Sequence, residues 1–440
     1  MMTMKMTLLT LVVLLAAPTL GLGNSPVTHR VRKTATVFTP TPLAARAHQW
    51  RAGSAVPISG GTLTLGSFLI DVTVGTGAGK KTLPLIVDTG SANLAVPSDY
   101  CPNCGAGKAP FFNHTASPSY TPLGCGAPAC GVCVVGGERG EGCIGLEDVC
   151  DANNAANCGF GISYGGSSSG LEGTLGTDVA CLGGDDSLCA KTNVGLISNS
   201  VVFAQDGPDF TGILGLSWET NACNPTCIPT AWGDVAKANG LPDLFGMCLT
   251  QTAGGAIDFG GINASRFSGD LAWAPVTTQR WYNLHVQGIA VGGNKVDVPS
   301  WFFSTRNDAI GSFVDSGTTV VLMGPVIFDQ FASTFTAAYP SLPGLKSILG
   351  GQCVSKDSIN VASYPNVVVS LAGEDGASVD ISIPPSSYLM DAGSVYCPGI
   401  AGGVPSLGVI LGDVALENYY VVYDRANTRV GFAPLVKDGC

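Results

Sequence analysis

The segment Leu85-Ile86-Val87-Asp88-Thr89-Gly90-Ser91 joins an apolar run to an Asp-Thr-Gly turn. A second copy, Ser312–Thr318 (SFVDSGT), occurs in the other half of the chain. Each copy is followed far downstream by an apolar-apolar-Gly element, Gly212–Gly215 (GILG) and Val409–Gly412 (VILG), which is suited to pack beneath the turn. A duplicated lobe is the simplest explanation of such a long repeat.

The repeated aspartates, Asp88 and Asp315, are the candidate catalytic residues. Each follows an apolar strand, and the glycine after it lets the backbone turn sharply. Two such turns that meet would place two carboxylates side by side. Because like charges that close cannot both ionise cheaply, the pair is expected to share one proton over an acidic pH range. Such a pair can activate a water molecule, so we expect no metal, no cofactor and no covalent intermediate.

The residues around each aspartate are expected to support it. A hydroxyl three positions beyond the aspartate can orient its carboxylate, and the hydroxyl directly after it can hydrogen-bond to the opposite strand. The supporting residues are therefore Thr89, Gly90, Ser91, Ser316, Gly317 and Thr318.

The first residues predict a secretory signal over 1–23. Lys5 provides the positive charge, Leu8–Ala17 is a short apolar core, and small residues follow at Gly21 and Gly23. The alternative is a membrane anchor, but this apolar run is too short to span a bilayer comfortably. No later segment is long and apolar enough to cross a membrane.

Residues 24–60 predict a basic propeptide. The total net charge is −11, yet the first 70 residues carry six basic and no acidic residues, so the remainder carries −17. A basic leader can lie on an acidic body by charge attraction, and acid would weaken that attraction by protonating the carboxylates. The alternative is a basic tail without a role.

The 16 cysteines, behind a signal sequence, predict mostly disulfides. Residues 101–158 are rich in Cys, Gly and Pro and predict a disulfide-tied insertion. A rival interpretation is a four-thiolate zinc site, formed by Cys101, Cys104, Cys130 and Cys133. Asn113 and Asn263 begin glycosylation acceptor motifs, which fit the same compartment.

The composition favours an all-β protein. Only 12% of residues are charged, and 60 Gly and 27 Pro provide frequent turns. The best helix candidate is Pro325–Ala338, which begins with proline and has apolar residues at near-helical spacing. Elsewhere strands and tight turns are expected.

Together these motifs resemble the pepsin-like aspartic protease family, from about Gly61 to Pro434. Further matching stretches are Ile162–Gly165 (ISYG), Phe259–Ile262 (FGGI) and the closing run Tyr419–Pro434. The resemblance implies an all-β, bilobal fold with a cleft between pseudo-two-fold lobes, at 61–265 and 266–440. It implies that Asp88 and Asp315 are the catalytic pair. It also implies a flap hairpin near 160–175, whose substrate-binding residues are Tyr164, Gly165 and Gly166.

The chain departs from pepsin itself in two places. Many members have Trp where this chain has Ala95, and that Trp normally braces the flap tyrosine. The insertion is similar to those of nepenthesin-like and plasmepsin V-like enzymes, and the C-terminal half resembles beta-secretase-like members. That last resemblance implies the disulfides Cys248–Cys440 and Cys353–Cys397. The other twelve cysteines are left unassigned.

These observations predict an acid-acting aspartic endopeptidase made as a zymogen. The expected partners are protein or peptide substrates and its own propeptide, with no nucleic acid and a monomeric state. We expect it in the secretory pathway, either secreted or delivered to a vacuole or lysosome. Two alternatives are a binding protein that has lost catalysis on the same fold, and a zinc-dependent secreted protein. The first is disfavoured because both aspartates and their hydroxyl neighbours are present.

Overall fold

The computed structural model describes most of the chain from Ser54 onward. The described residues are 54–62, 67–102, 104, 110–124, 127, 130, 157–164, 169–184, 186–201, 212–222, 227–306, 309–436 and 439–440. The predicted signal sequence, most of the predicted propeptide and most of the cysteine-rich insertion lie outside these residues.

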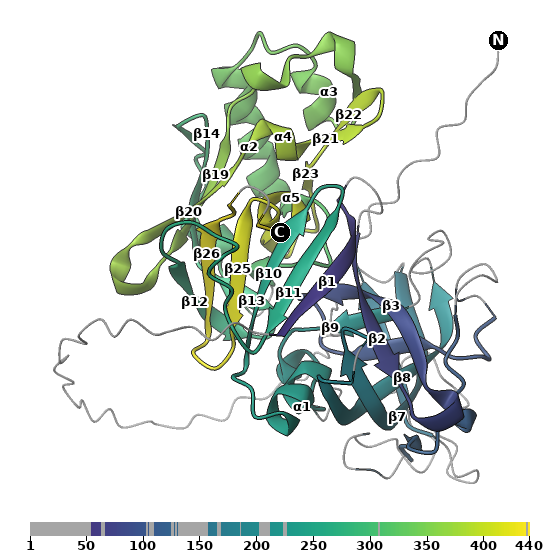
Figure 1. The fold of residues 1–440 in the computed structure, drawn as a ribbon. Coiled ribbons are helices and arrows are strands. Elements are labelled where there is room, and N and C mark those ends of the chain that lie inside the picture. Colours follow the sequence, from purple (N-terminus) through teal and green to yellow (C-terminus); the bar gives the residue numbers. More distant parts are fainter. Residues whose placement is uncertain are drawn as a thin grey trace, which may run out of the picture.

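Strands dominate the structure, which confirms the all-β prediction, and the chain forms two lobes (Figure 1). The strands of the first half are β1 (Ser54–Gly61), β2 (Ser67–Val74), β3 (Lys81–Asp88), β4 (Leu94–Pro97), β5 (Thr121–Pro122), β6 (Gly159–Tyr164), β7 (Ser169–Leu182), β8 (Cys189–Val201), β9 (Gly212–Gly215), β10 (Leu244–Thr250) and β11 (Gly254–Phe259). Those of the second half are β12 (Ala272–Gln279), β13 (Tyr282–Leu284), β14 (Val286–Val291), β15 (Asn294–Lys295), β16 (Gly311–Val314), β17 (Val321–Met323), β18 (Val354–Ser355), β19 (Val367–Ala372), β20 (Ser378–Ile383), β21 (Leu389–Ala392), β22 (Val395–Pro398), β23 (Ile400–Gly402), β24 (Leu407–Leu411), β25 (Tyr419–Asp424) and β26 (Arg429–Pro434). The α-helices are α1 (Ala231–Ala238), α2 (Pro325–Ala338), α3 (Leu345–Leu349), α4 (Pro385–Tyr388) and α5 (Asp413–Leu416).

The sequence repeat is also a structural repeat. In the first lobe β3 runs parallel to β9, with Asp88 opposite Gly215, and β4 pairs antiparallel with β9 on its other side. In the second lobe β16 runs parallel to β24, and β17 pairs antiparallel with β24. The apolar-apolar-Gly element therefore lies between the strand that precedes the aspartate and the strand that follows it.

The repeated glycines are required by this close packing. A Cβ at Gly215 would lie 2.5 Å from the amide nitrogen of Asn93. In the second copy a Cβ at Gly412 would lie 2.3 Å from the carbonyl oxygen of Thr318. Both distances are too short for a side chain, so glycine is needed where the backbone passes under each turn.

A six-stranded antiparallel sheet joins the two halves, in the order β1-β11-β10-β25-β26-β12. Figure 1 shows β1 from the start of the described chain and β25 and β26 from its end in this one sheet, with β10 and β11 between them. Strand β1 begins at Ser54, inside the segment assigned to the propeptide, and also pairs with β2. The end of that segment is thus part of the sheet in this structure.

Helix α2 spans Pro325–Ala338, which confirms the helix prediction. Proline is suited to the first turn, because the backbone N–H that it lacks would have no intrahelical partner there. The helix buries Ile327, Phe331 and Phe335 against the core of the second lobe. The helix packs against β14 and β15 of a four-stranded sheet, whose strand order is β15-β14-β19-β20.

Several disulfides close the fold. Cys248 in β10 pairs with Cys440 at the C-terminus, and Cys353 pairs with Cys397, as the beta-secretase-like resemblance implies. The first links positions 192 residues apart and fastens the last residues to the central sheet. The remaining described pairs are Cys101–Cys104, Cys130–Cys158 and Cys181–Cys189.

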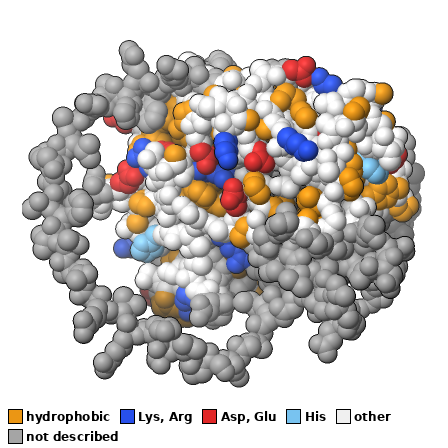
Figure 2. All heavy atoms as spheres, turned by 90° about the horizontal axis from the view of Figure 1, so that it is seen from below, with side chains coloured by type: hydrophobic (Ala, Val, Ile, Leu, Met, Phe, Trp, Pro, Cys, Tyr) orange, Lys and Arg blue, Asp and Glu red, His pale blue; other side chains and the backbone are white. Residues whose placement is uncertain are grey.

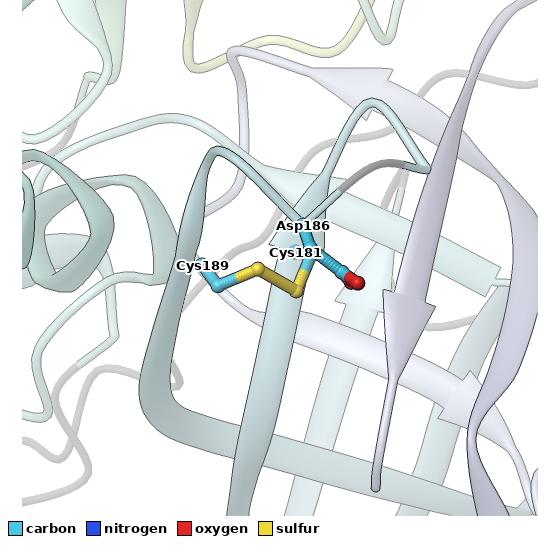
Figure 3. A group of neighbouring side chains, drawn as sticks. All are labelled: Cys181, Asp186 and Cys189. Carbon is cyan, nitrogen blue, oxygen red and sulfur yellow. A yellow bond between two sulfur atoms is a disulfide. The ribbon is translucent and has the colours of Figure 1, made fainter.

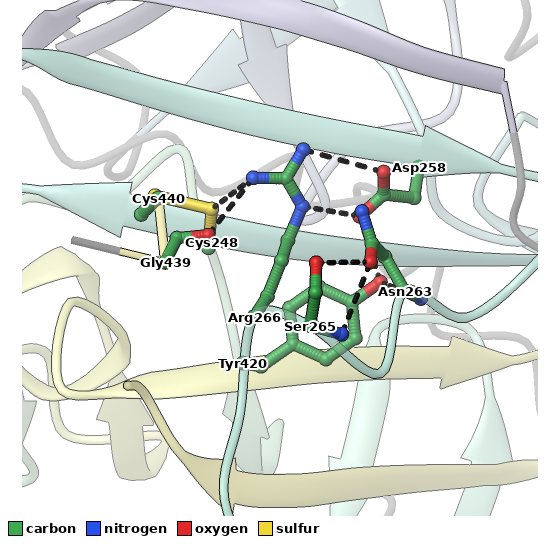
Figure 4. Close-up of polar contacts among 8 residues, drawn as sticks. All are labelled: Cys248, Asp258, Asn263, Ser265, Arg266, Tyr420, Gly439 and Cys440. Carbon is green, nitrogen blue, oxygen red and sulfur yellow. Dashed lines mark hydrogen bonds and ion pairs between the residues drawn. A yellow bond between two sulfur atoms is a disulfide. The ribbon is translucent and has the colours of Figure 1, made fainter. Parts of the chain in front are cut away.

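A buried ion pair lies beside the C-terminal disulfide (Figure 4). Arg266 Nε donates to Asp258 Oδ2 over 2.8 Å, and Tyr420 Oη donates to the same oxygen over 2.8 Å. Arg266 also donates to the carbonyl of Gly439 over 3.0 Å. Burying Asp258 is tolerable because its charge is paired and hydrogen-bonded.

The molecular surface carries both signs of charge. On the face shown in Figure 2, acidic and basic side chains lie next to one another, and hydrophobic atoms are scattered among polar ones. The described helices include none with the length and hydrophobicity needed to cross a membrane.

Candidate active site

Asp88 and Asp315 occupy equivalent positions at the ends of β3 and β16. In each turn the amide two residues later donates to the Oδ1 atom of the aspartate. Gly90 N lies 2.7 Å from Asp88 Oδ1, and Gly317 N lies 2.8 Å from Asp315 Oδ1. Such backbone donors stabilise the ionised form of a carboxylate.

The hydroxyls three residues beyond the aspartates lie where the sequence pattern predicts them. Ser91 Oγ donates to Asp88 Oδ2, and Thr318 Oγ1 donates to Asp315 Oδ2 over 2.6 Å. Each carboxylate therefore has one backbone donor and one hydroxyl donor, which fix its orientation. The two turns are chemically alike, as a pseudo-two-fold arrangement requires.

A reciprocal pair of hydrogen bonds ties the two turns together. Thr89 N donates to Ser316 Oγ over 3.2 Å, and Ser316 N donates to Thr89 Oγ1 over 3.0 Å. Ser316 Oγ in turn donates to the carbonyl of Val87 over 2.8 Å. Because these bonds join residues of different lobes, they set the separation of the two carboxylates.

The carboxylates lie close together and are buried. A Cβ placed on Gly90 would lie 2.6 Å from Asp315 Oδ1, so the first turn touches the second aspartate. Both aspartates are fully buried. Burial raises the pKa of Asp88 well above its usual range, and the charge of Asp315 raises it further. Burial also raises the pKa of Asp315, although donation from Thr318 partly offsets the increase. The pair therefore retains a proton under acidic conditions.

Two further buried carboxyls lie behind the pair, on and after α5. Asp413 directly follows the second apolar-apolar-Gly element, and its place in the sequence predicted no role for it. Neither of its carboxyl oxygens has a hydrogen-bond partner among the described residues, and burial together with the charge of Asp315 raises its pKa well above its usual range. Glu417 accepts from Gln251 Nε2 over 2.7 Å and from Thr62 Oγ1 over 3.1 Å. These contacts connect the second lobe to the end of β1 and to the β10–β11 turn.

Replacing Glu417 by Gln should remove a pH dependence of stability. Burial raises the pKa of Glu417 to about 6, from 4.5 for the free group. Its stabilising contribution is therefore complete below pH 4.5 and is lost as the pH rises through 6. The loss amounts to about 2 kcal/mol in the free energy of unfolding. Urea unfolding at pH 4 to 7, in an Asp315→Asn background that prevents self-digestion, measures the difference between the proteins with and without Glu417→Gln.

Asp297→Asn, which removes an exposed carboxyl, is the control for this experiment and should leave the pH profile unchanged. Parallel stability profiles with and without the Glu417→Gln change across this pH range would contradict the expectation.

The flap residues are only partly described. Strands β6 and β7 form an antiparallel hairpin, in which Tyr164 pairs with Ser169. Gly165 and Gly166 lie outside the described residues, so the flap assignment stays a prediction. Ala95, at the position of the usual Trp, is fully buried in a cluster with Ile162 of β6.

The described cysteines do not support the zinc interpretation. Cys101 and Cys104 are bonded to each other, so they are not thiolate ligands, and Cys130 is bonded to Cys158. Figure 3 shows a separate cluster of potential ligands, in which Cys181 and Cys189 form a disulfide beside Asp186. With both sulfurs oxidised, that cluster offers a metal only one carboxylate. Cys133 lies outside the described residues.

Comparison with known proteins places this geometry in a family. A family model described as eukaryotic aspartyl protease matches residues 67–127 and 150–435. An aspartyl protease family protein of Arabidopsis thaliana is 31% identical over 394 residues, covering 86% of this chain and 73% of that protein. Cathepsin E of Aquarana catesbeiana is 29% identical over 369 residues, covering 82% of this chain and 78% of that protein. Pepsin A of Canis lupus familiaris is 27% identical over 373 residues, covering 82% of this chain and 80% of that protein.

These matches and the bilobal β fold define the class of the protein as an aspartic-type endopeptidase, a hydrolase that acts on peptide substrates. The chain belongs to the pepsin-like family of eukaryotic aspartyl proteases. The resemblance inferred from the repeated aspartate motif is confirmed.

Proposed function

We propose that Asp88 and Asp315 form the catalytic pair of an endopeptidase that works at acidic pH. The observation that carries the proposal is the symmetric placement of two buried carboxyls, each held by one amide and one hydroxyl and joined across the lobes. The aspartic-protease pair is the standard example of two carboxyls that share one proton.

In this proposal the ionised member of the pair takes a proton from a water molecule held between the two carboxyls. The water then attacks the carbonyl carbon of the scissile peptide bond. The protonated member donates to the carbonyl oxygen, where negative charge develops. As the C–N bond breaks, the proton taken from the water passes to the leaving amine, and the proton on the former carbonyl oxygen returns to the other carboxylate, so the pair again holds one shared proton. Ser91 and Thr318 keep the carboxylates oriented throughout, because each hydroxyl donates to Oδ2 of its aspartate.

The direct test is hydrolysis of an unfolded polypeptide by the acid-treated protein between pH 2 and 7. Activity should be highest on the acidic side, where the pair keeps its shared proton, and a statine-type transition-state mimic should inhibit it. Absence of cleavage throughout this range would sink the proposal.

The alternative of a binding protein without catalysis makes a different prediction for the same mimic. A site that has lost catalysis should not bind a transition-state mimic strongly. Titrating the mimic by calorimetry therefore separates the two functions. Tight binding supports the enzyme, and weak binding with intact folding supports the alternative.

We further propose that the enzyme is made as a zymogen whose basic leader is removed in acid. The body's carboxylates lose charge as the pH falls, which weakens the attraction of a leader with excess positive charge. Cleavage before Ser54 would leave β1 in the central sheet, where it pairs with both β11 and β2.

Acid exposure should therefore shorten the chain from its N-terminus. N-terminal sequencing before and after incubation at pH 3 to 4 should show a new end between Ala45 and Gly61, together with the appearance of activity. An Asp88→Asn protein kept at the same pH is the control for self-processing. Full activity of the unprocessed chain would contradict the zymogen proposal.

The secretory pathway is the proposed location, with secretion or a vacuole or lysosome as the destination. The described disulfides suit an oxidising compartment. Both acceptor asparagines form the same local turn: Thr115 Oγ1 donates to Asn113 Oδ1, and Ser265 Oγ donates to Asn263 Oδ1, each over 2.7 Å. We propose that the enzyme acts as a monomer.

A further inference from the structure

Arg280 lies in the turn between β12 and β13, next to the Asp88 loop. Its carbonyl accepts a hydrogen bond from Ser217 Oγ. Ser217 N donates to the carbonyl of Ser91 over 2.8 Å, and Ser91 holds Asp88. A short chain of hydrogen bonds therefore fixes the backbone of Arg280 relative to the first catalytic aspartate.

The side chain of Arg280 is also linked, through Trp281, to the strand that precedes the second turn. Its guanidinium lies 4.4 Å from the ring centre of Trp281. Trp281 is buried and stacks on Phe313, with ring centres 5.5 Å apart and an interplanar angle of 22°. Phe313 is in β16, two residues before Asp315. Arg280 is thus placed at the junction of the two turns that bear the candidate catalytic pair.

The charge of Arg280 is not neutralised within the described structure. Its side chain is partly buried, its Nε atom is buried without a hydrogen-bond partner, and no described carboxylate forms an ion pair with it. Burial alone lowers the pKa of its guanidinium, which stays charged at any working pH. In contrast, Arg266, Arg425 and Arg429 each lie against a carboxylate. A buried, unpaired donor is costly, and such a group near a reactive centre suggests a missing partner.

We propose that Arg280 is a specificity-determining residue that binds a carboxylate of the substrate close to the scissile bond. The inference rests on the proposed function and adds a substrate class to it: peptides that carry an acidic side chain or a free C-terminal carboxylate at the matching position. A planar guanidinium can bind either carboxylate through two parallel hydrogen bonds. The donors that would meet it are the two terminal nitrogens, which, unlike Nε, are not buried without a partner.

A set of matched peptides tests the proposal. Each peptide has Glu or Gln at one of the three positions on either side of a single cleavable bond, with blocked ends. The enzyme should prefer Glu to Gln at one position by about 10-fold or more in kcat/KM, which is typical of a charge-assisted hydrogen bond. The preference should vanish as the pH falls below about 4.3, where the Glu side chain of the peptide becomes neutral. Because the same catalytic pair cleaves both peptides, its own titration changes both values of kcat/KM alike and leaves their ratio unchanged.

A second arm distinguishes the two sources of a carboxylate. Peptides of decreasing length beyond the cleaved bond are compared with free and with amidated C-termini. If the main ligand is the chain end, one length should show the 10-fold preference for the free acid, and the internal Glu series should show none. If the main ligand is a side chain, the internal Glu series should show the preference, and the free and amidated C-termini should give equal rates.

The variants then assign the preference to Arg280. Arg280→Gln should bring the Glu-to-Gln ratio close to one, and Arg280→Lys should restore part of it by keeping the charge. Arg306→Gln removes the same charge from an exposed arginine that also stacks on a tryptophan, Trp301, with 4.8 Å to the ring centre. That control should keep the wild-type ratio.

The outcomes separate this inference from the proposed function. Cleavage of the neutral peptides without any preference for a carboxylate would overturn the role of Arg280 and leave the enzyme activity standing. If no peptide is cleaved, the proposed function fails. Calorimetric binding of statine peptides in Glu and Gln forms then tests Arg280 without turnover, and equal affinities for the wild-type protein would overturn the proposal.

Discussion

Replacing either Asp88 or Asp315 by Asn should reduce kcat/KM for an unfolded polypeptide or peptide substrate by about 10³-fold or more. Each change removes one member of a pair that must act as base and acid in turn, and positioned proton transfer alone contributes about 10²–10⁴-fold. Asparagine keeps the size of the side chain: its Oδ1 can still accept from the amide of Gly90 or Gly317, and its Nδ2 can donate to the hydroxyl oxygen of Ser91 or Thr318. Steady-state hydrolysis at several acidic pH values measures the loss.

The same variants separate chemistry from folding. Near-ultraviolet circular dichroism should match that of the wild-type protein, because the bonds between Thr89 and Ser316 that join the lobes are untouched. Asp270→Asn, at an exposed position, should retain full activity. If either the Asp88→Asn or the Asp315→Asn variant keeps activity within tenfold of the wild type, the catalytic assignment is wrong.

The sequence predicted the local features of the fold best. The repeated segments at Asp88 and Asp315 pair with their downstream partners as the repeat suggested, and Pro325–Ala338 is helical from end to end. Both predictions rest on patterns within a short window, where apolar runs, glycine and proline act directly on the backbone.

The pairing of distant segments was not predictable in this way. The central sheet brings β1 next to β11 and β10 next to β25, and the two strands of each pair are far apart in the sequence. Nothing in the local pattern of Ser54–Gly61 distinguishes a strand of this sheet from the end of a leader. That information lies in the complementary edge of β11, which becomes apparent only in three dimensions.

In the site, too, the features set by local sequence were predictable and those set by distant contacts were not. The aspartates and their hydroxyl neighbours follow from motif and spacing, whereas the environment of Arg280 and Glu417 depends on contacts across the fold. Glu417 is unusual because burial by separate segments raises its pKa, and Arg280 is unusual because no described carboxylate lies against it. A single sequence carries no signal for either condition.

Gly90→Ala should also slow the enzyme strongly, although it removes no functional group. The added Cβ would lie 2.6 Å from Asp315 Oδ1 and 2.7 Å from its Cγ, so the turn or the carboxylate must shift. The turn is held by Ser91 and by the bonds between Thr89 and Ser316, which resist such a shift. A displacement of about 1 Å at a reacting group can cost 10²-fold in rate. We expect kcat to fall by about that factor.

The measurement is kcat and KM on one peptide substrate, together with the free energy of unfolding, which overpacking should lower by about 1–3 kcal/mol. Gly288→Ala is the matched control, because a Cβ at Gly288 meets no atom within 4 Å. It should leave both the rate and the stability close to wild type. An unchanged kcat in Gly90→Ala would mean that the two turns do not approach each other in the working enzyme, since a methyl group could then fit between them. The Gly90→Ala substitution is therefore the most direct test of whether the two lobes bring their carboxyls together during catalysis.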